Sequence, residues 1–331
     1  MAKWHFDDEG DLDLLSGKTV GVFGYGNQGR SQALNMRDAG LNVIIGSRAD
    51  ASSEKSAADG FETLPLLEAA RRADILFILV PDEIMPDVYK NHIEPGLQAS
   101  NTLNFASGYN IHFKKIVPRA DVNVIMLAPR MVGQGVRDTV VEGKGYPSLV
   151  AVHQDATGNA QNIMIALAKA IGTTRMGCIE SSFEEETIVD LFNEHFGFLH
   201  AVRRGCEVLI EAGCSPEAAI LELYASGEMR EVGQYFVDHG LFEQLKLHSR
   251  TSQYGQLVYA RPSPDEEEAD KDRLRDVVRK IKDGTFARIW TGVQENDAEA
   301  LDREKAALDA TPLMVEERRL YEKLRRRKSR G

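Results

Sequence analysis

The segment Val20-Gly-Val-Phe-Gly-Tyr-Gly-Asn-Gln-Gly29 decides the fold of this chain. An apolar run typical of a buried strand leads into the glycines, and a helical pattern over residues 31–38 follows them. In such a turn Gly24 permits the tight bend, Gly26 lets the backbone approach a pyrophosphate, and Gly29 lets helix pack closely on strand. The N-terminus of the helix then faces the phosphates. The segment predicts a dinucleotide-binding turn made of Gly24, Tyr25, Gly26, Asn27, Gln28 and Gly29.

Strand-like and helix-like patterns alternate from this segment to about residue 175. We expect strands at residues 19–23, 42–45, 75–80, 102–105, 123–128 and 148–152, with helical patterns such as 65–72 and 157–170 between them. Alternation of this kind predicts a parallel sheet with helices on both faces.

Only helical periodicity remains beyond residue 182. It covers residues 184–213, 216–238, 264–283 and 297–310. The predicted fold class is therefore α/β, with a Rossmann-type parallel-sheet domain over residues 1–181. An all-α domain is predicted over residues 182–331.

The composition excludes several classes of protein. The 331 residues carry a net charge of −11, which argues against a nucleic-acid-binding surface. The basic tail at residues 323–330 is a local exception, and we interpret it as a solvated helix end or a frayed terminus. Three cysteines without paired spacing predict reduced thiols in a cytoplasmic protein, with neither a disulfide framework nor a zinc site. No apolar run approaches the length of a membrane span or marks a signal region.

The end of the second strand bears on the choice of cofactor. An acidic residue there would bind the ribose 2′-hydroxyl of NADH, whereas arginine and hydroxyl groups would bind the 2′-phosphate of NADPH. This chain has Arg48 in that region, and the following loop carries Ser52, Ser53 and Lys55. We predict NADPH as cofactor and keep NADH possible, because Asp50 in the same loop would repel a phosphate.

Three carboxylates share one face of a predicted helix in the second domain. Glu186, Asp190 and Glu194 follow one another at intervals of four residues among apolar neighbours. Such a face suits a hard divalent cation such as Mg²⁺ or a general acid–base pair. Taken alone, however, the pattern favours a solvated acidic stripe.

Several longer motifs resemble the ketol-acid reductoisomerases in their short form, over nearly the whole chain. They lie at residues 24–29, 33–40, 80–82, 108–113, 128–129, 133, 136–137, 154–158, 183–194, 254–255 and 284–290. The family binds two Mg²⁺ ions through four helical carboxylates; an alkyl group migrates, and NAD(P)H then reduces the resulting ketone. It builds each active site from the helical domains of two subunits, so the resemblance implies a homodimer or a higher homo-oligomer.

The resemblance assigns roles residue by residue. Asp190 and Glu194 fall on the first two metal-ligand positions, and Glu222 falls on the third. Ser249 matches a serine that contacts the substrate carboxylate. The motifs also place four more residues at the cofactor: Val80, Pro81, Asp82 and Ser107.

Three positions depart from the family pattern. Ser226 stands at the fourth metal-ligand position, Ser107 replaces a histidine, and Arg130 replaces the catalytic lysine. Arginine keeps the positive charge but hardly deprotonates, so Arg130 would orient an anionic substrate and serve poorly as a proton shuttle. Loss of one carboxylate weakens a two-metal site, and Mg²⁺ binding, if retained, would rest on Asp190 and Glu194.

The intact nucleotide turn and the altered site favour one function over two others. We expect a reductase of this family that reduces a C=O or C=N bond of a small polar substrate without isomerisation, with Arg130, Asp190, Glu194, Glu222 and Ser249 in its catalytic site. A working ketol-acid reductoisomerase of branched-chain amino-acid synthesis is the first alternative, and a non-catalytic cofactor-binding partner is the second.

Overall fold

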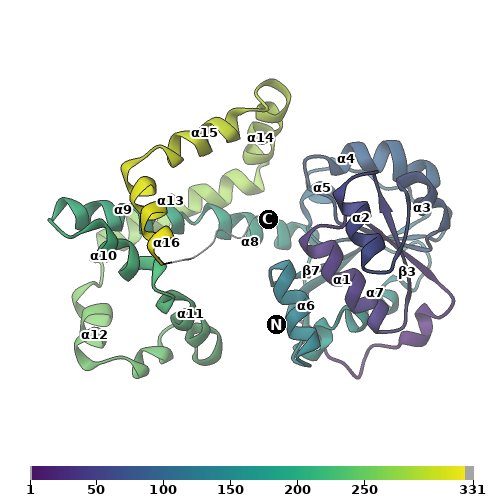
Figure 1. The fold of residues 1–331 in the computed structure, drawn as a ribbon. Helices are drawn as coiled ribbons and strands as arrows, with labels where there is room; N and C mark the ends of the chain where they lie inside the picture. The colour runs from purple at the N-terminus through teal and green to yellow at the C-terminus, as the bar shows by residue number, and fades with distance from the viewer. Residues whose placement is uncertain (1, 325–331) are drawn as a thin grey trace. The chain divides into compact units, whose positions relative to one another are not determined.

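The computed structural model describes residues 2–324 of the chain. Residues 325–330 of the basic tail lie outside this range. The structure divides into two compact units, Met1–Leu191 and Phe192–Gly331 (Figure 1). Each is described by itself.

The first unit contains one nine-stranded sheet within the described residues. Its strands are β1 (Trp4–His5), β2 (Thr19–Phe23), β3 (Asn42–Ser47), β4 (Glu62–Pro65), β5 (Ile75–Ile78), β6 (Thr102–Phe105), β7 (Asn123–Pro129), β8 (Ser148–Gln154) and β9 (Cys178–Glu180). They lie in the order β1-β9-β8-β7-β6-β5-β2-β3-β4. The six strands predicted from the sequence are all present, and β1, β4 and β9 were not foreseen.

The helices of the first unit lie between these strands. They are α1 (Asn27–Asp38), α2 (Ala51–Ala58), α3 (Leu66–Arg72), α4 (Met85–Val88), α5 (Tyr109–His112), α6 (Gly133–Val141) and α7 (Ala160–Ile171). Side chains of α1 and α7 form the core on one face of the sheet. Side chains of α3, α4 and α5 form the core on the other face, so helices cover both faces as predicted.

The sheet is mainly parallel, as predicted, but two strand pairs are antiparallel. β7 pairs antiparallel with β8, and β1 pairs antiparallel with β9. Ser148 at the start of β8 lies opposite Pro129 at the end of β7. After α6 the chain turns back through Gly143 and Gly145, which both have positive φ. It enters β8 beside the carboxyl end of β7, so β8 runs in the opposite direction to β7.

The described part of the second unit is entirely helical, as predicted. Helix α8 (Phe183–His195) leads into it, followed by α9 (Phe198–Glu211), α10 (Pro216–Ile220), a π-helical turn η5 (Leu221–Ala225), α11 (Glu228–His239), α12 (Arg250–Tyr254), α13 (Pro264–Lys282), α14 (Thr285–Asn296), α15 (Ala300–Asp309) and α16 (Pro312–Lys323). Gly197 and Gly227, with φ of +88° and +109°, break two stretches that the sequence predicted as continuous helices. Among residues 2–324 no helix is both long and apolar enough to cross a membrane.

Candidate active site

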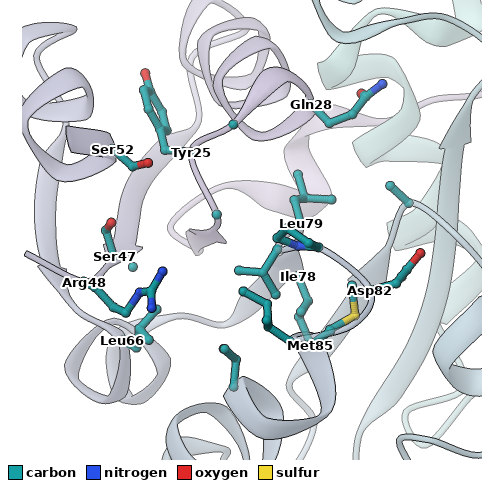
Figure 2. Close-up of a pocket in the computed structure, with 18 of the residues that line it drawn as sticks. Tyr25, Gln28, Ser47, Arg48, Ser52, Leu66, Ile78, Leu79, Asp82 and Met85 are labelled. Atoms are coloured by element: carbon teal, nitrogen blue, oxygen red, sulfur yellow. The ribbon is translucent and has the colours of Figure 1, made fainter. Parts of the chain in front are cut away.

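A pocket of about 550 Å³ lies at the carboxyl ends of β2, β3, β5 and β6. These strands flank the point where the strand order reverses, because β3 and β4 lie on one side of β2 and β5 to β7 lie on the other. Ligands of open α/β sheets bind at such a reversal. In Figure 2, Ser47, Arg48 and Ser52 lie on one side of the pocket and Asp82 lies across from them.

The glycine-rich turn has the geometry that its sequence predicts. Gly24 has a φ of +100°, and a Cβ there would lie 2.7 Å from the carbonyl of Leu79. A Cβ on Gly29 would lie 1.8 Å from the carbonyl oxygen of Gly24, so only glycine allows this approach of α1 to the turn. Gly26 precedes α1 and has open space where a Cβ would stand. No side chain caps the N-terminus of α1, so its backbone N–H groups are oriented for an anion.

Side-chain bonds hold the turn in place. The hydroxyl of Tyr25 donates to Oδ2 of Asp59 at 2.9 Å, and Arg30 donates to both carboxylate oxygens of Asp59 at 2.7 and 3.0 Å. On the other side, Nε2 of Gln28 donates to the carbonyl of Met131 at 2.9 Å. The turn is thus tied to the end of α2 and to the loop after β7.

Most of the residues predicted to bind the cofactor line this pocket. They are Gly24, Tyr25, Gly26, Asn27, Gln28, Arg48, Ser52, Val80, Pro81, Asp82 and Ser107. Gly29 and Ser53 do not line the pocket; the hydroxyl of Ser53 donates to the carbonyl of Asp50 at 2.8 Å. Apolar residues that the sequence did not single out, Leu66, Ile84 and Met85, complete the wall. A dinucleotide fits this combination of open backbone, helix terminus and apolar wall.

Asp50 has a structural task beside the predicted phosphate-binding residues. Its Oδ1 accepts from the backbone N–H of Ser52 at 2.9 Å and so caps α2. Its Oδ2 lies 3.8 Å from Nε of Arg48, whose side chain is 74% exposed. Arg48 therefore extends over the pocket mouth with most of its surface available to a ligand.

The loop after β7 carries Arg130 to helix α8. Nη1 of Arg130 donates to Oδ1 of Asp190 at 3.0 Å, and Nη2 donates to Oε1 of Glu186 at 2.9 Å. The second oxygen of Glu186 accepts from the backbone N–H of Gly108 at 2.6 Å. Gly108 follows Ser107 of the pocket wall, so these bonds connect the pocket with the acidic face of α8.

Of the three carboxyl groups on this face of α8, that of Glu186 is the most deeply buried. Its side chain is 0% exposed, and desolvation raises its pKa to about 7, against the lowering effect of the Gly108 N–H and of Arg130. The regular interval of Glu186, Asp190 and Glu194 revealed the shared helix face. No feature of the sequence indicates that Glu186 is the most deeply buried of the three or that it binds Arg130.

The other predicted catalytic residues lie in the second unit. Glu194 is exposed near the end of α8, and Glu222 is exposed in the π-helical turn η5. Ser226 follows that turn, and its hydroxyl accepts from the N–H of Glu228 at 3.2 Å. Ser249 caps α12 by accepting from the N–H of Ser252 at 3.2 Å.

Comparison with known proteins identifies the family. The family model described as "Acetohydroxy acid isomeroreductase, NADPH-binding domain" matches residues 14–177, and "Ketol-acid reductoisomerase, C-terminal domain" matches residues 183–326. The chain is 43% identical over 307 residues to the ketol-acid reductoisomerase (NADP(+)) of Pyrococcus abyssi, covering 91% of each protein. It is 42% identical to the putative ketol-acid reductoisomerase 3 of Saccharolobus solfataricus, covering 97% of this chain and 98% of that one.

A solved structure of the same family is similar throughout. The NADH-preferring ketol-acid reductoisomerase from an uncultured archean superposes with a TM-score of 0.89 at 33% identity, over 99% of this chain and 100% of that one. The two family models together span nearly all of the sequence, and the relatives match over almost their full length. The chain therefore belongs to the ketol-acid reductoisomerase family and is an NAD(P)H-dependent oxidoreductase.

Proposed function

We propose that this member of the family reduces a C=O or C=N bond of a small polar substrate without isomerising it. The observation that supports this most is the placement of Arg130, whose two terminal nitrogens bind Glu186 and Asp190. A guanidinium held in this way can polarise a substrate but hardly exchanges a proton, whereas the family has a lysine there. Ser107 and Ser226 supply neither the imidazole nor the carboxylate of the family pattern. Loss at three points argues against the migration step, which needs two polarising cations.

The pocket residues suggest how the reducing cofactor is held. Bound NADPH would supply a hydride to the carbon, and water or the carboxyl of Asp190 or Glu194 would supply the proton to the oxygen or nitrogen. The glycine turn and the N-terminus of α1 would hold the pyrophosphate of the cofactor. Arg48 and Ser52, with Ser47 beside them, would bind its 2′-phosphate. The names of several relatives include NADP(+), and that of the similar solved structure includes a preference for NADH, so NADH stays possible for this chain.

Turnover of a substrate that needs reduction only tests this function. 3-Hydroxy-3-methyl-2-oxobutyrate is such a substrate, and a small cyclic imine probes C=N reduction. We expect NADPH oxidation with at least one of the two, at rates that differ little between saturating Mg²⁺ and excess chelator. A reaction with neither compound, or a strict requirement for Mg²⁺, would contradict the proposal.

A working ketol-acid reductoisomerase is the second candidate, favoured by the names of relatives that are 41–43% identical over most of the chain. It would need another carboxylate in place of Ser226. Glu228, the first residue of α11, is the nearest in sequence.

We also propose a homodimer or a multiple of it. In the second unit the buried core cluster is small, with Cys206, Ile220, Ala225, Leu313 and Leu320 as its members. Many large apolar side chains of that unit are exposed instead, among them Phe236, Val237, Leu241, Phe242, Leu247, Tyr254, Leu257, Val258 and Tyr259. Helices with so much exposed apolar surface need a partner.

A further inference from the structure

The bonds of Arg130 bear on whether a divalent cation fits at Asp190. The resemblance gives Asp190 the first metal-ligand position, yet its Oδ1 accepts from Arg130 at 3.0 Å. The same guanidinium reaches Glu186, one helical turn earlier on α8, at 2.9 Å. One planar cation thus bridges two carboxylates on a single helix face.

Two features keep the guanidinium at this place. Glu186 is fully buried, and Arg130 is the cation that stabilises its ionised form there. Glu186 is itself held by the N–H of Gly108 at 2.6 Å, which fixes the position of the carboxylate that Arg130 binds. The Arg130 side chain is 30% exposed and that of Asp190 is 42% exposed, so the bonded pair lies at the border of the solvent.

An arginine here differs physically from the lysine of the family. An ammonium is a compact charge on a flexible stem, and it can turn away from one carboxylate when a metal ion arrives. A planar guanidinium that binds both carboxylates at once could make the same movement only by giving up this paired bonding. A divalent ion on Asp190 would meet a permanent positive charge bound to the same carboxylate.

The remaining donor set is also poor for a pair of ions. Ser226 offers a neutral hydroxyl at the fourth ligand position, and that oxygen already accepts from the N–H of Glu228. Hard divalent cations take carboxylate oxygens by preference, and two adjacent ions need their negative charge. The donors on this chain therefore do not fit the two-metal site that the family implies.

We propose that the guanidinium of Arg130, held by Glu186, takes the place of a divalent cation at Asp190. The inference rests on the proposed function in that a reductase without a migration step needs one fixed positive charge rather than two metal ions. Arg130 supplies that charge from the chain itself. Each terminal nitrogen of the guanidinium carries two N–H groups, and one of each pair makes the bond to Glu186 or Asp190. The second N–H of each pair is directed away from that bond.

Direct metal binding tests this without any measurement of activity. Mn²⁺ is titrated into the full-length protein in the presence of NADPH, and free Mn²⁺ is followed by electron paramagnetic resonance. The variants are Arg130→Lys, Arg130→Lys combined with Asp190→Asn, and Arg137→Lys. The last is a matched control, because Arg137 lies on α6 and binds Asn35 and Asp38 instead.

We expect Arg130→Lys to bind Mn²⁺ at least about tenfold more tightly than the wild type, since the lysine can release Asp190. Asp190→Asn should remove this gain, and Arg137→Lys should behave as the wild type. The proposal is overturned if the wild type binds Mn²⁺ as tightly as Arg130→Lys, or if Arg130→Lys gains nothing that depends on Asp190. Failure of the reductase assay would count against the proposed function alone, because the titration measures binding only.

Discussion

Glu186 joins the pocket wall to the acidic face of α8, and its ionisation should be visible in the stability of the protein. Desolvation raises its pKa from 4.5 to about 7 in the folded state. The folded protein therefore keeps this proton to higher pH than the unfolded chain does. The stability that this proton contributes is fully present below pH 4.5 and is lost as the pH rises towards 7.

Glu186→Gln should remove this pH dependence, because glutamine does not titrate. Between pH 5 and pH 8 the free energy of unfolding of the wild type should fall relative to that of Glu186→Gln by about 3 kcal/mol. Urea unfolding of both proteins at the two pH values measures the difference. A relative rise instead of a fall would mean that Arg130 and Gly108 outweigh desolvation and hold the pKa below 4.5.

Arg48 is the residue on which a preference for NADPH should depend. Its side chain is mostly exposed at the pocket mouth, where a 2′-phosphate would be its partner. Arg48→Ala should weaken NADPH binding about tenfold, the effect of one lost bond to a charged group, and should leave NADH affinity nearly unchanged. Calorimetry with both nucleotides measures this. Lys55→Ala serves as control, because Lys55 lies on α2 outside the pocket. Equal losses for both nucleotides would refute the assignment.

At the scale of elements, two glycines of one turn should respond differently to the same substitution. A Cβ on Gly29 would overlap the carbonyl oxygen of Gly24, so Gly29→Ala should destabilise the first unit by about 3 kcal/mol. Gly26→Ala meets no heavy atom within 4 Å and should cost about 1 kcal/mol or less. It should nevertheless weaken NADPH binding at least about tenfold, because the methyl group enters the space predicted for the pyrophosphate.

Thermal unfolding and nucleotide titration of both variants separate these effects. Intact NADPH affinity in a stable Gly26→Ala protein would show that the pyrophosphate lies elsewhere.

The sequence predicted the central strands and the turn because both have strong local patterns. Buried strands appear in the sequence as apolar runs. A Gly-x-Gly-x-x-Gly spacing between a strand and a helix is typical of dinucleotide binding. The direction of β8 left no such trace, since an apolar run such as residues 149–152 has the same composition whether its neighbour is parallel or antiparallel. β1 and β4 are short edge strands, and β4 is the sequence Glu-Thr-Leu-Pro, which has little apolar character.

The helical half shows a similar limit. Gly197 and Gly227 interrupt helices at positive φ, yet a glycine inside a helical pattern does not by itself reveal such a break. The partnership of Arg130 with Glu186 joins residues 56 positions apart, and no local pattern reports a contact of that range.

At the scale of the whole molecule, the exposed apolar side chains of the second unit predict self-association. Sedimentation at micromolar concentration should give a dimer or a multiple of it. Leu241→Asp combined with Phe242→Asp should shift the protein towards the monomer, because both side chains are largely exposed within the described chain. Val117→Asp, at an exposed apolar residue of the first unit, is the matched control. An active wild-type monomer would contradict the proposal.

Turnover of 2-acetolactate tests the central claim, loss of isomerisation, most directly, because this substrate must be isomerised before it can be reduced. The assay uses saturating Mg²⁺ and NADPH and a protein prepared free of any host reductoisomerase. Ser107, Arg130 and Ser226 predict no detectable conversion under conditions in which a reduction-only substrate is consumed. Conversion at about one per second or faster, the low end of ordinary enzyme rates, would show that the isomerising machinery survives and would contradict the account.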